Sequence, residues 1–68
     1  MKWNVNRWYE AKIHYIDLLN RCRTFIRSYE SKDERQVVIN DFLRRENEGI
    51  IQKVTAIDLY DFEIWERV

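Results

Sequence analysis

Few side chains in this sequence could carry out catalysis, and their spacing does not assemble a reactive group. The chain has one histidine, His14, and one cysteine, Cys22. A histidine base needs an oriented partner, and a cysteine nucleophile needs both a base and donors that stabilise an oxyanion. We therefore expect His14 to be an exposed side chain beside Lys12 and Cys22 to be a buried, inert thiol. The sequence predicts a protein that is not an enzyme and has no catalytic residues.

Four carboxylates near the C-terminal end are the only other candidates for site chemistry: Asp58, Asp61, Glu63 and Glu66. Hard cations prefer several oxygen ligands, but this spacing matches no calcium loop and lacks the glycine of its turn. One cysteine and one histidine cannot complete a structural zinc site, and a single glycine excludes a glycine-rich phosphate loop. We expect no metal and no cofactor, and a solvated acidic face.

Basic side chains and tryptophans together favour binding rather than catalysis. Cations interleaved with stacking rings suit single-stranded nucleic acid. The formal net charge is zero, however, so the chain lacks the usual electrostatic footprint of such proteins. Nucleic-acid binding is therefore the alternative function, and its residues would be Arg21, Arg23, Arg27, Arg44 and Arg45. The competing interpretation is that these arginines pair with nearby carboxylates or complement a helix dipole.

Three tryptophans carry the leading functional prediction. Trp8 and Trp65 fall among polar residues in segments that otherwise alternate, and Trp3 lies in the same N-terminal segment as Trp8. A tryptophan on a polar face is costly unless something covers it, so each is a candidate interface anchor. The alternative is a ring lying on lysine or arginine stems. We predict a small protein-binding module or regulator whose contact surface contains these three rings.

The length of the chain makes self-association an expectation as well. Sixty-eight residues allow a single domain, 1–68, with a small core that usually needs a staple or a partner. One cysteine cannot form an internal disulfide, whereas ten aromatic residues can supply interface area. Residues 1–29 carry six basic and two acidic side chains, and residues 46–68 carry two basic and six acidic ones. This asymmetry favours pairing of the two ends, within one chain or across a homodimer.

The expected location is the cytoplasm. Residues 1–12 lack the apolar run of a secretory signal, and no stretch approaches the roughly 18 apolar residues of a membrane span. An unpaired thiol is typical of a reducing compartment. We therefore predict a cytoplasmic protein without membrane contact.

Two helices are predicted in the middle of the chain. Residues 15–29 place apolar side chains at three- and four-residue steps, which is typical of an amphipathic helix. Those side chains are Tyr15, Leu18, Leu19, Cys22, Phe25, Ile26 and Tyr29. A second helix should start near Lys32, since Ser31 and Glu34 form a capping-box pattern, and it should end at 47–49, where Gly49 can take the left-handed conformation.

Both ends of the chain alternate as half-buried strands do. The odd positions of residues 2–15 are apolar except for Arg7, and residues 50–68 suit an extended segment with a bend near Asp58. A helix fits either end as an alternative, but the thirteen isoleucines and valines favour strands. The predicted fold class is α+β, strand–helix–helix–strand, with a two-stranded ribbon packed on two helices. A three-helix bundle is the alternative.

Overall fold

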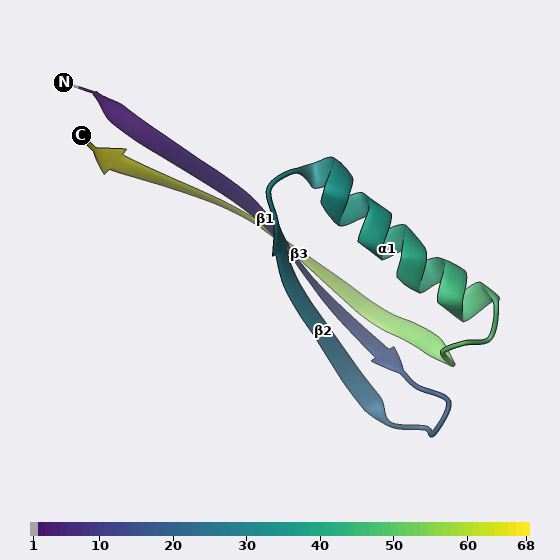
Figure 1. Cartoon of the computed structure of the whole chain (residues 1–68). Coiled ribbons are helices and arrows are strands. Elements are labelled where there is room, and N and C mark those ends of the chain that lie inside the picture. Colours follow the sequence, from purple (N-terminus) through teal and green to yellow (C-terminus); the bar gives the residue numbers. More distant parts are fainter. Residues whose placement is uncertain (1) are drawn as a thin grey trace.

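A computed structural model describes residues 2–68. Its elements follow in the order β1 (Trp3–Ile16), β2 (Cys22–Tyr29), α1 (Lys32–Asn47) and β3 (Lys53–Arg67). The strands form one antiparallel sheet in the order β2-β1-β3, and α1 lies along one part of it (Figure 1). No helix among the described residues is long and apolar enough to cross a membrane.

The predicted fold class is wrong because residues 15–29 do not form a helix. They complete β1, turn, and return as β2, so the chain has three strands and one helix rather than two strands and two helices. The three-helix bundle is excluded by the same finding. The expected apolar stripe is divided between two environments. Leu18 and Leu19 are 61% and 72% exposed, whereas Tyr15, Phe25 and Tyr29 pack against the core.

The hairpin between β1 and β2 is set by two polar residues. Oδ1 of Asp17 accepts the backbone N–H groups of Leu19 and Arg21, each at 2.9 Å. Asn20 adopts a φ of 61°, a left-handed conformation that asparagine tolerates better than most residues. The residues that follow are rich in β-branched and aromatic types, which favour a strand. Turn chemistry and strand propensity therefore prevail over a helix-like spacing.

The other predicted elements are confirmed. The Ser31 side chain accepts the Glu34 N–H at 3.1 Å and caps α1, and Gly49 follows the helix with a φ of 76°. The terminal segments form β1 and β3. The bend predicted near Asp58 is not found, since β3 pairs continuously through it; the register shift lies opposite His14 and Tyr15 of β1.

The core is small and lies toward one end of the molecule. Its buried members come from β1, from α1 and from the segment after the helix: Ala11, Ile13, Ile39, Phe42 and Ile51. Burial of each larger side chain stabilises the fold by about 1.5–3 kcal/mol. The molecule measures 54 × 19 × 12 Å, and α1 covers only the part where three strands lie together (Figure 1).

Candidate functional site

The part of the molecule that α1 leaves uncovered is a two-stranded extension, which we call the ribbon arm: residues 3–8 of β1 paired with residues 62–67 of β3. β2 pairs with β1 only from Tyr9 onward, so the ribbon arm has a free edge along each strand. Figure 1 shows it projecting from the rest of the sheet, with the two ends of the chain at its tip. An isolated two-stranded ribbon is at best marginally stable in water.

One face of the ribbon arm carries a pair of indole rings. The centroids of Trp3 and Trp65 lie 6.4 Å apart in an edge-to-face arrangement, and the Arg67 guanidinium lies 5.2 Å from the Trp3 ring centroid. The Trp65 Nε1–H donates a hydrogen bond to a carboxylate oxygen of Glu63. Trp3 is nevertheless 46% exposed and Trp65 is 56% exposed, so the contacts within the chain leave about half of the two indoles open to solvent.

The opposite face is also apolar. Trp8 stacks on Phe62 with ring centroids 5.3 Å apart and planes inclined by 15°. Tyr60 continues the row, with its ring centroid 6.4 Å from that of Phe62. Ile64 lies farther out on the same face of β3 and is exposed. A ribbon with apolar side chains on both faces has no side that suits contact with water alone.

A buried arginine joins the ribbon arm to the helix. Arg35 of α1 is only 7% exposed and donates to Oδ1 of Asp61 at 2.8 Å. Its guanidinium also donates to the backbone carbonyls of Tyr60 and Glu10 at 3.2 and 3.4 Å and lies 5.6 Å from the Tyr9 ring centroid. The hydrogen bond from Arg35, and secondarily the charge of nearby Lys32, lowers the pKa of the Asp61 carboxyl. Arg35 thus fixes the base of the arm.

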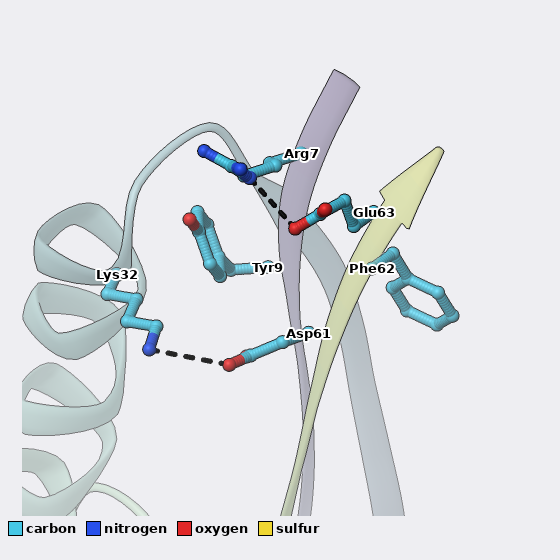
Figure 2. Close-up of a pocket in the computed structure, with 6 residues that line it drawn as sticks. All are labelled: Arg7, Tyr9, Lys32, Asp61, Phe62 and Glu63. Atoms are coloured by element: carbon cyan, nitrogen blue, oxygen red, sulfur yellow. Dashed lines mark hydrogen bonds and ion pairs between the residues drawn. The ribbon is translucent and has the colours of Figure 1, made fainter. Parts of the chain in front are cut away.

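Next to this junction lies a hollow of about 360 Å³ between the start of α1 and the ribbon arm (Figure 2). Its charged groups satisfy one another: Arg7 pairs with Glu63 at 2.9 Å, and Lys32 with Asp61 at 3.5 Å. The Trp65 N–H, followed by Arg7, lowers the pKa of Glu63. The hollow is lined by Arg7, Tyr9, Lys32, Asp61, Phe62 and Glu63. With its cations and carboxylates already paired, it braces the arm rather than presenting groups for catalysis.

His14 and Cys22 differ from the sequence predictions. His14 is half-buried rather than exposed, with Nδ1 3.2 Å from Oγ1 of Thr24 and Nε2 3.0 Å from Oδ2 of Asp58. This order of carboxylate, imidazole and hydroxyl is that of hydrolase triads, which also require oxyanion donors. Here it lies on the middle strand, whose N–H groups are engaged by the strands on both sides. Cys22 is exposed rather than buried.

The described part of the chain also contains no cluster of three or more histidine, cysteine or carboxylate side chains that could hold a metal ion. The four C-terminal carboxylates are spread along β3, whose successive side chains point to opposite faces. Asp58 contacts His14, and Glu63 contacts Arg7. Asp58, Asp61 and Glu63 are therefore partners of basic groups in this fold.

Most of the arginines proposed for nucleic-acid binding are paired with carboxylates. Arg21 and Arg23 both donate to Oδ2 of Asp17, at 2.8 and 3.2 Å, beside the hairpin turn. Arg44 and Arg45 pair with Asp41 at the far end of α1. Arg27 lies over the Tyr29 ring on β2. Arg23 and Arg27 therefore share a strand, not a helix. Because four of the five are already paired, nucleic-acid binding stays a prediction without support from this geometry.

The structure does bring the three predicted tryptophans into one element, the ribbon arm, although on two faces. Sequence reasoning missed the other apolar residues of this surface as well as Arg35. The apolar residues could have been found from the alternation through residues 60–65, which places Tyr60, Phe62 and Ile64 on one face of a strand. The signal for Arg35 is its spacing of four and seven residues before Ile39 and Phe42, both buried against the sheet.

No family model, curated protein or solved structure matches this chain.

Proposed function

We propose that this protein is a non-enzymatic protein-binding module, a regulator that works as a homodimer, and that the ribbon arm is its contact element. The observation that carries the proposal is a concentration of large apolar side chains outside the cover of α1. They are Trp3, Val5, Phe62, Ile64 and Trp65, each between 38% and 56% exposed. Contiguous exposed apolar surface of this kind marks interaction sites, and tryptophan is enriched among residues that dominate binding energy.

The energetics of the arm support the same proposal. Its two strands have only each other for backbone pairing, and neither face is covered by another element. Each large apolar side chain that a partner buries would contribute about 1.5–3 kcal/mol. A protein surface supplies both apolar cover and backbone pairing. We place this activity in the cytoplasm, where the exposed Cys22 thiol would remain reduced.

The test replaces the indoles without weakening the strands. In the double variant Trp3→Thr/Trp65→Thr and in Trp8→Thr, threonine preserves strand propensity while removing the ring. Leu19→Thr is the matched control, because Leu19 is 72% exposed at the hairpin turn, away from the arm. Proteins recovered with the tagged chain from its native cell are compared at two salt concentrations, after circular dichroism has established that each variant is folded.

We expect the tryptophan variants to lose the partner, with affinity reduced by about 30-fold or more, whereas Leu19→Thr retains it. Binding through apolar surface should also vary little with salt. Folded tryptophan variants that keep every association of the parent would overturn the proposal. Recovery of nucleic acid whose binding falls steeply with salt and is unaffected by loss of the rings would favour the arginine-based alternative.

A further inference from the structure

We infer that the free edge of β1 in the ribbon arm pairs with the same edge of a second copy of this chain, antiparallel and with two-fold symmetry at Val5. The inference rests on the proposed homodimer and specifies its interface. Three observations carry it: the direction of the backbone groups at this edge, the self-complementary order of residues 2–8, and the charge of the competing edge on β3.

The backbone of β1 presents unpaired groups in the right places. The Val68 N–H donates to the Lys2 carbonyl at 3.1 Å, and the β1–β3 register is regular from Trp3 to His14. Backbone direction alternates along a strand, so even-numbered residues of the arm point toward β3. Odd-numbered residues point to the other side, where β2 pairs farther along. Between residues 3 and 7 that side is a free edge, at which Trp3, Val5 and Arg7 direct their N–H and C=O groups outward.

The sequence KWNVNRW is complementary to itself when it is reversed about Val5. In this register Val5 faces its own copy, and Asn4 faces the partner's Asn6, amide to amide. Trp3 lies opposite the partner's Arg7, and Lys2 lies opposite the partner's Trp8. Each cation thus meets an aromatic ring and no cation meets a cation, an arrangement that favours association.

The register also agrees with the backbone geometry. Val5 and its copy, and Trp3 with the partner's Arg7, would be hydrogen-bonded pairs, because these odd-numbered residues have outward N–H and C=O groups. Residues Asn4 and Asn6 would form the closer, non-hydrogen-bonded pairs, in which side chains interact most strongly. The interface therefore combines main-chain pairing with a side-chain partner at every position.

The outer edge of β3 is less suited to the same pairing. It carries Glu63 and Glu66 along the arm and Asp61 at the base of the arm, against one cation, Arg67. A second copy paired about Glu63 would oppose the two Glu63 carboxylates, which is destabilising, whereas pairing about Trp65 would set Glu63 against the partner's Arg67 and leave no cation facing an aromatic ring. Charged side chains are also a common way in which proteins block a sheet edge. The β1 edge has no carboxylate between residues 2 and 8.

The two-fold symmetry would join the arms of the two copies into one surface. A two-fold axis at an antiparallel pair is perpendicular to the sheet, so both copies of α1 would lie on the same face of a continuous four-stranded sheet. Between the helices, the floor of that face would include Trp3, Val5 and Trp65 from each copy, together with the charged Arg7, Glu63 and Arg67. The exposed indole pair of each arm would thereby become part of one wider apolar surface for a further protein.

Hydrogen exchange of the unmodified chain tests the inference first. We expect protection of the Val5 amide to rise with protein concentration, whereas the Trp65 amide, which points to the free edge of β3, stays unprotected. An isotope-filtered experiment on a mixture of labelled and unlabelled chains should show contact between Asn4 and the partner's Asn6. A chain that remains monomeric near millimolar concentration, or protection of Trp65 in place of Val5, would overturn the inference.

Variants of Val5 then distinguish the contribution of backbone pairing at the β1 edge from the contribution of the side chain. Val5→Pro removes an outward N–H that no bond within the chain uses, so a folded monomer is expected, with self-association weakened about tenfold or more. Val5→Thr keeps the N–H and should still dimerise. Sedimentation equilibrium measures each. A Val5→Pro chain that remains dimeric would overturn this interface while leaving the protein-binding proposal intact.

Discussion

Replacement of Arg35 by methionine should strongly destabilise the junction between the helix and the base of the ribbon arm, because the guanidinium is buried and hydrogen-bonded there. The substitution removes a hydrogen bond to the Asp61 carboxylate at 2.8 Å and two to backbone carbonyls, and it keeps most of the side-chain volume. Hydrogen bonds to a charged group contribute about 1.5–3 kcal/mol each, less when they are long or when water can replace the lost partner. Because Asp61 is half exposed and one carbonyl contact measures 3.4 Å, we expect a loss of about 2–4 kcal/mol in the free energy of unfolding.

Urea unfolding followed by circular dichroism measures this loss, and Lys32→Met is the matched control. Lys32 pairs with the same carboxylate, but its side chain is 64% exposed and the separation is 3.5 Å, so its removal should cost less than about 1 kcal/mol. Hydrogen exchange should also show faster opening of the arm amides in Arg35→Met than in Lys32→Met. The reasoning is refuted if the two variants have the same stability and the same exchange in the arm.

Three further outcomes follow from the core, from one buried hydroxyl and from the hairpin turn. Phe42→Ala removes a 4%-exposed ring beside Phe25 and Tyr15 and should lower the free energy of unfolding, measured in urea, by about 3–5 kcal/mol. Val37→Ala, at an exposed position of the same helix, should change it little. Equal losses in the two variants would contradict this core. Tyr29→Phe should leave stability unchanged or raise it by up to about 1 kcal/mol, because the Tyr29 hydroxyl is buried without a hydrogen-bond partner among residues 2–68; a clear loss of stability would show that the hydroxyl is satisfied. The backbone N–H of Arg21, followed by the Arg23 and Arg21 side chains, lowers the pKa of Asp17 to about 2, so the stability that its charge provides is complete above pH 4 and is lost as the pH falls toward 2. In Asp17→Asn, the free energy of unfolding should therefore change less with pH between 4 and 2. The same pH dependence in variant and parent would contradict this role of Asp17.

The sequence is informative where a local rule determines the structure. Ser31 and Glu34 predict the start of α1, Gly49 predicts its end, and alternation predicts the strands at both ends. Apolar periodicity fails to predict the structure of residues 15–29, because their apolar side chains have helical spacing in the sequence but lie on two strands and a turn. Asp17 and Asn20 supply the turn chemistry that distinguishes the two structures, although a helix through these residues would also place Asp17 one turn from Arg21, as an ion pair. The Asp17–Arg21 contact does exist, but it spans a hairpin turn.

Part of the candidate site could also be predicted from a local sequence pattern. A tryptophan among polar residues, as Trp8 and Trp65 are, indicates a ring that needs cover, and both rings lie in the ribbon arm together with Trp3. Their arrangement depends on strand pairing between distant segments, which places Trp65 opposite Val5 and Phe62 opposite Trp8. No local pattern fixes that register. The arginines that the sequence offered for nucleic-acid binding are mostly paired with carboxylates, and this pairing depends on the hairpin and helix geometry that the sequence pattern did not determine.

The ribbon arm itself is a consequence of element lengths. A 16-residue helix spans about 24 Å at 1.5 Å per residue, and the eight residues of β2 span about 26 Å. The 14 residues of β1 span about 46 Å, and β3 is of similar length. Only two residues connect β2 to α1, so the helix must start where β2 ends and run back along the same half of the sheet. Neither element can reach residues 3–8. All three tryptophans lie in that uncovered half, and Lys2 and Arg7 stand where a reversed copy would present aromatic rings, as the proposed contact with a second chain requires.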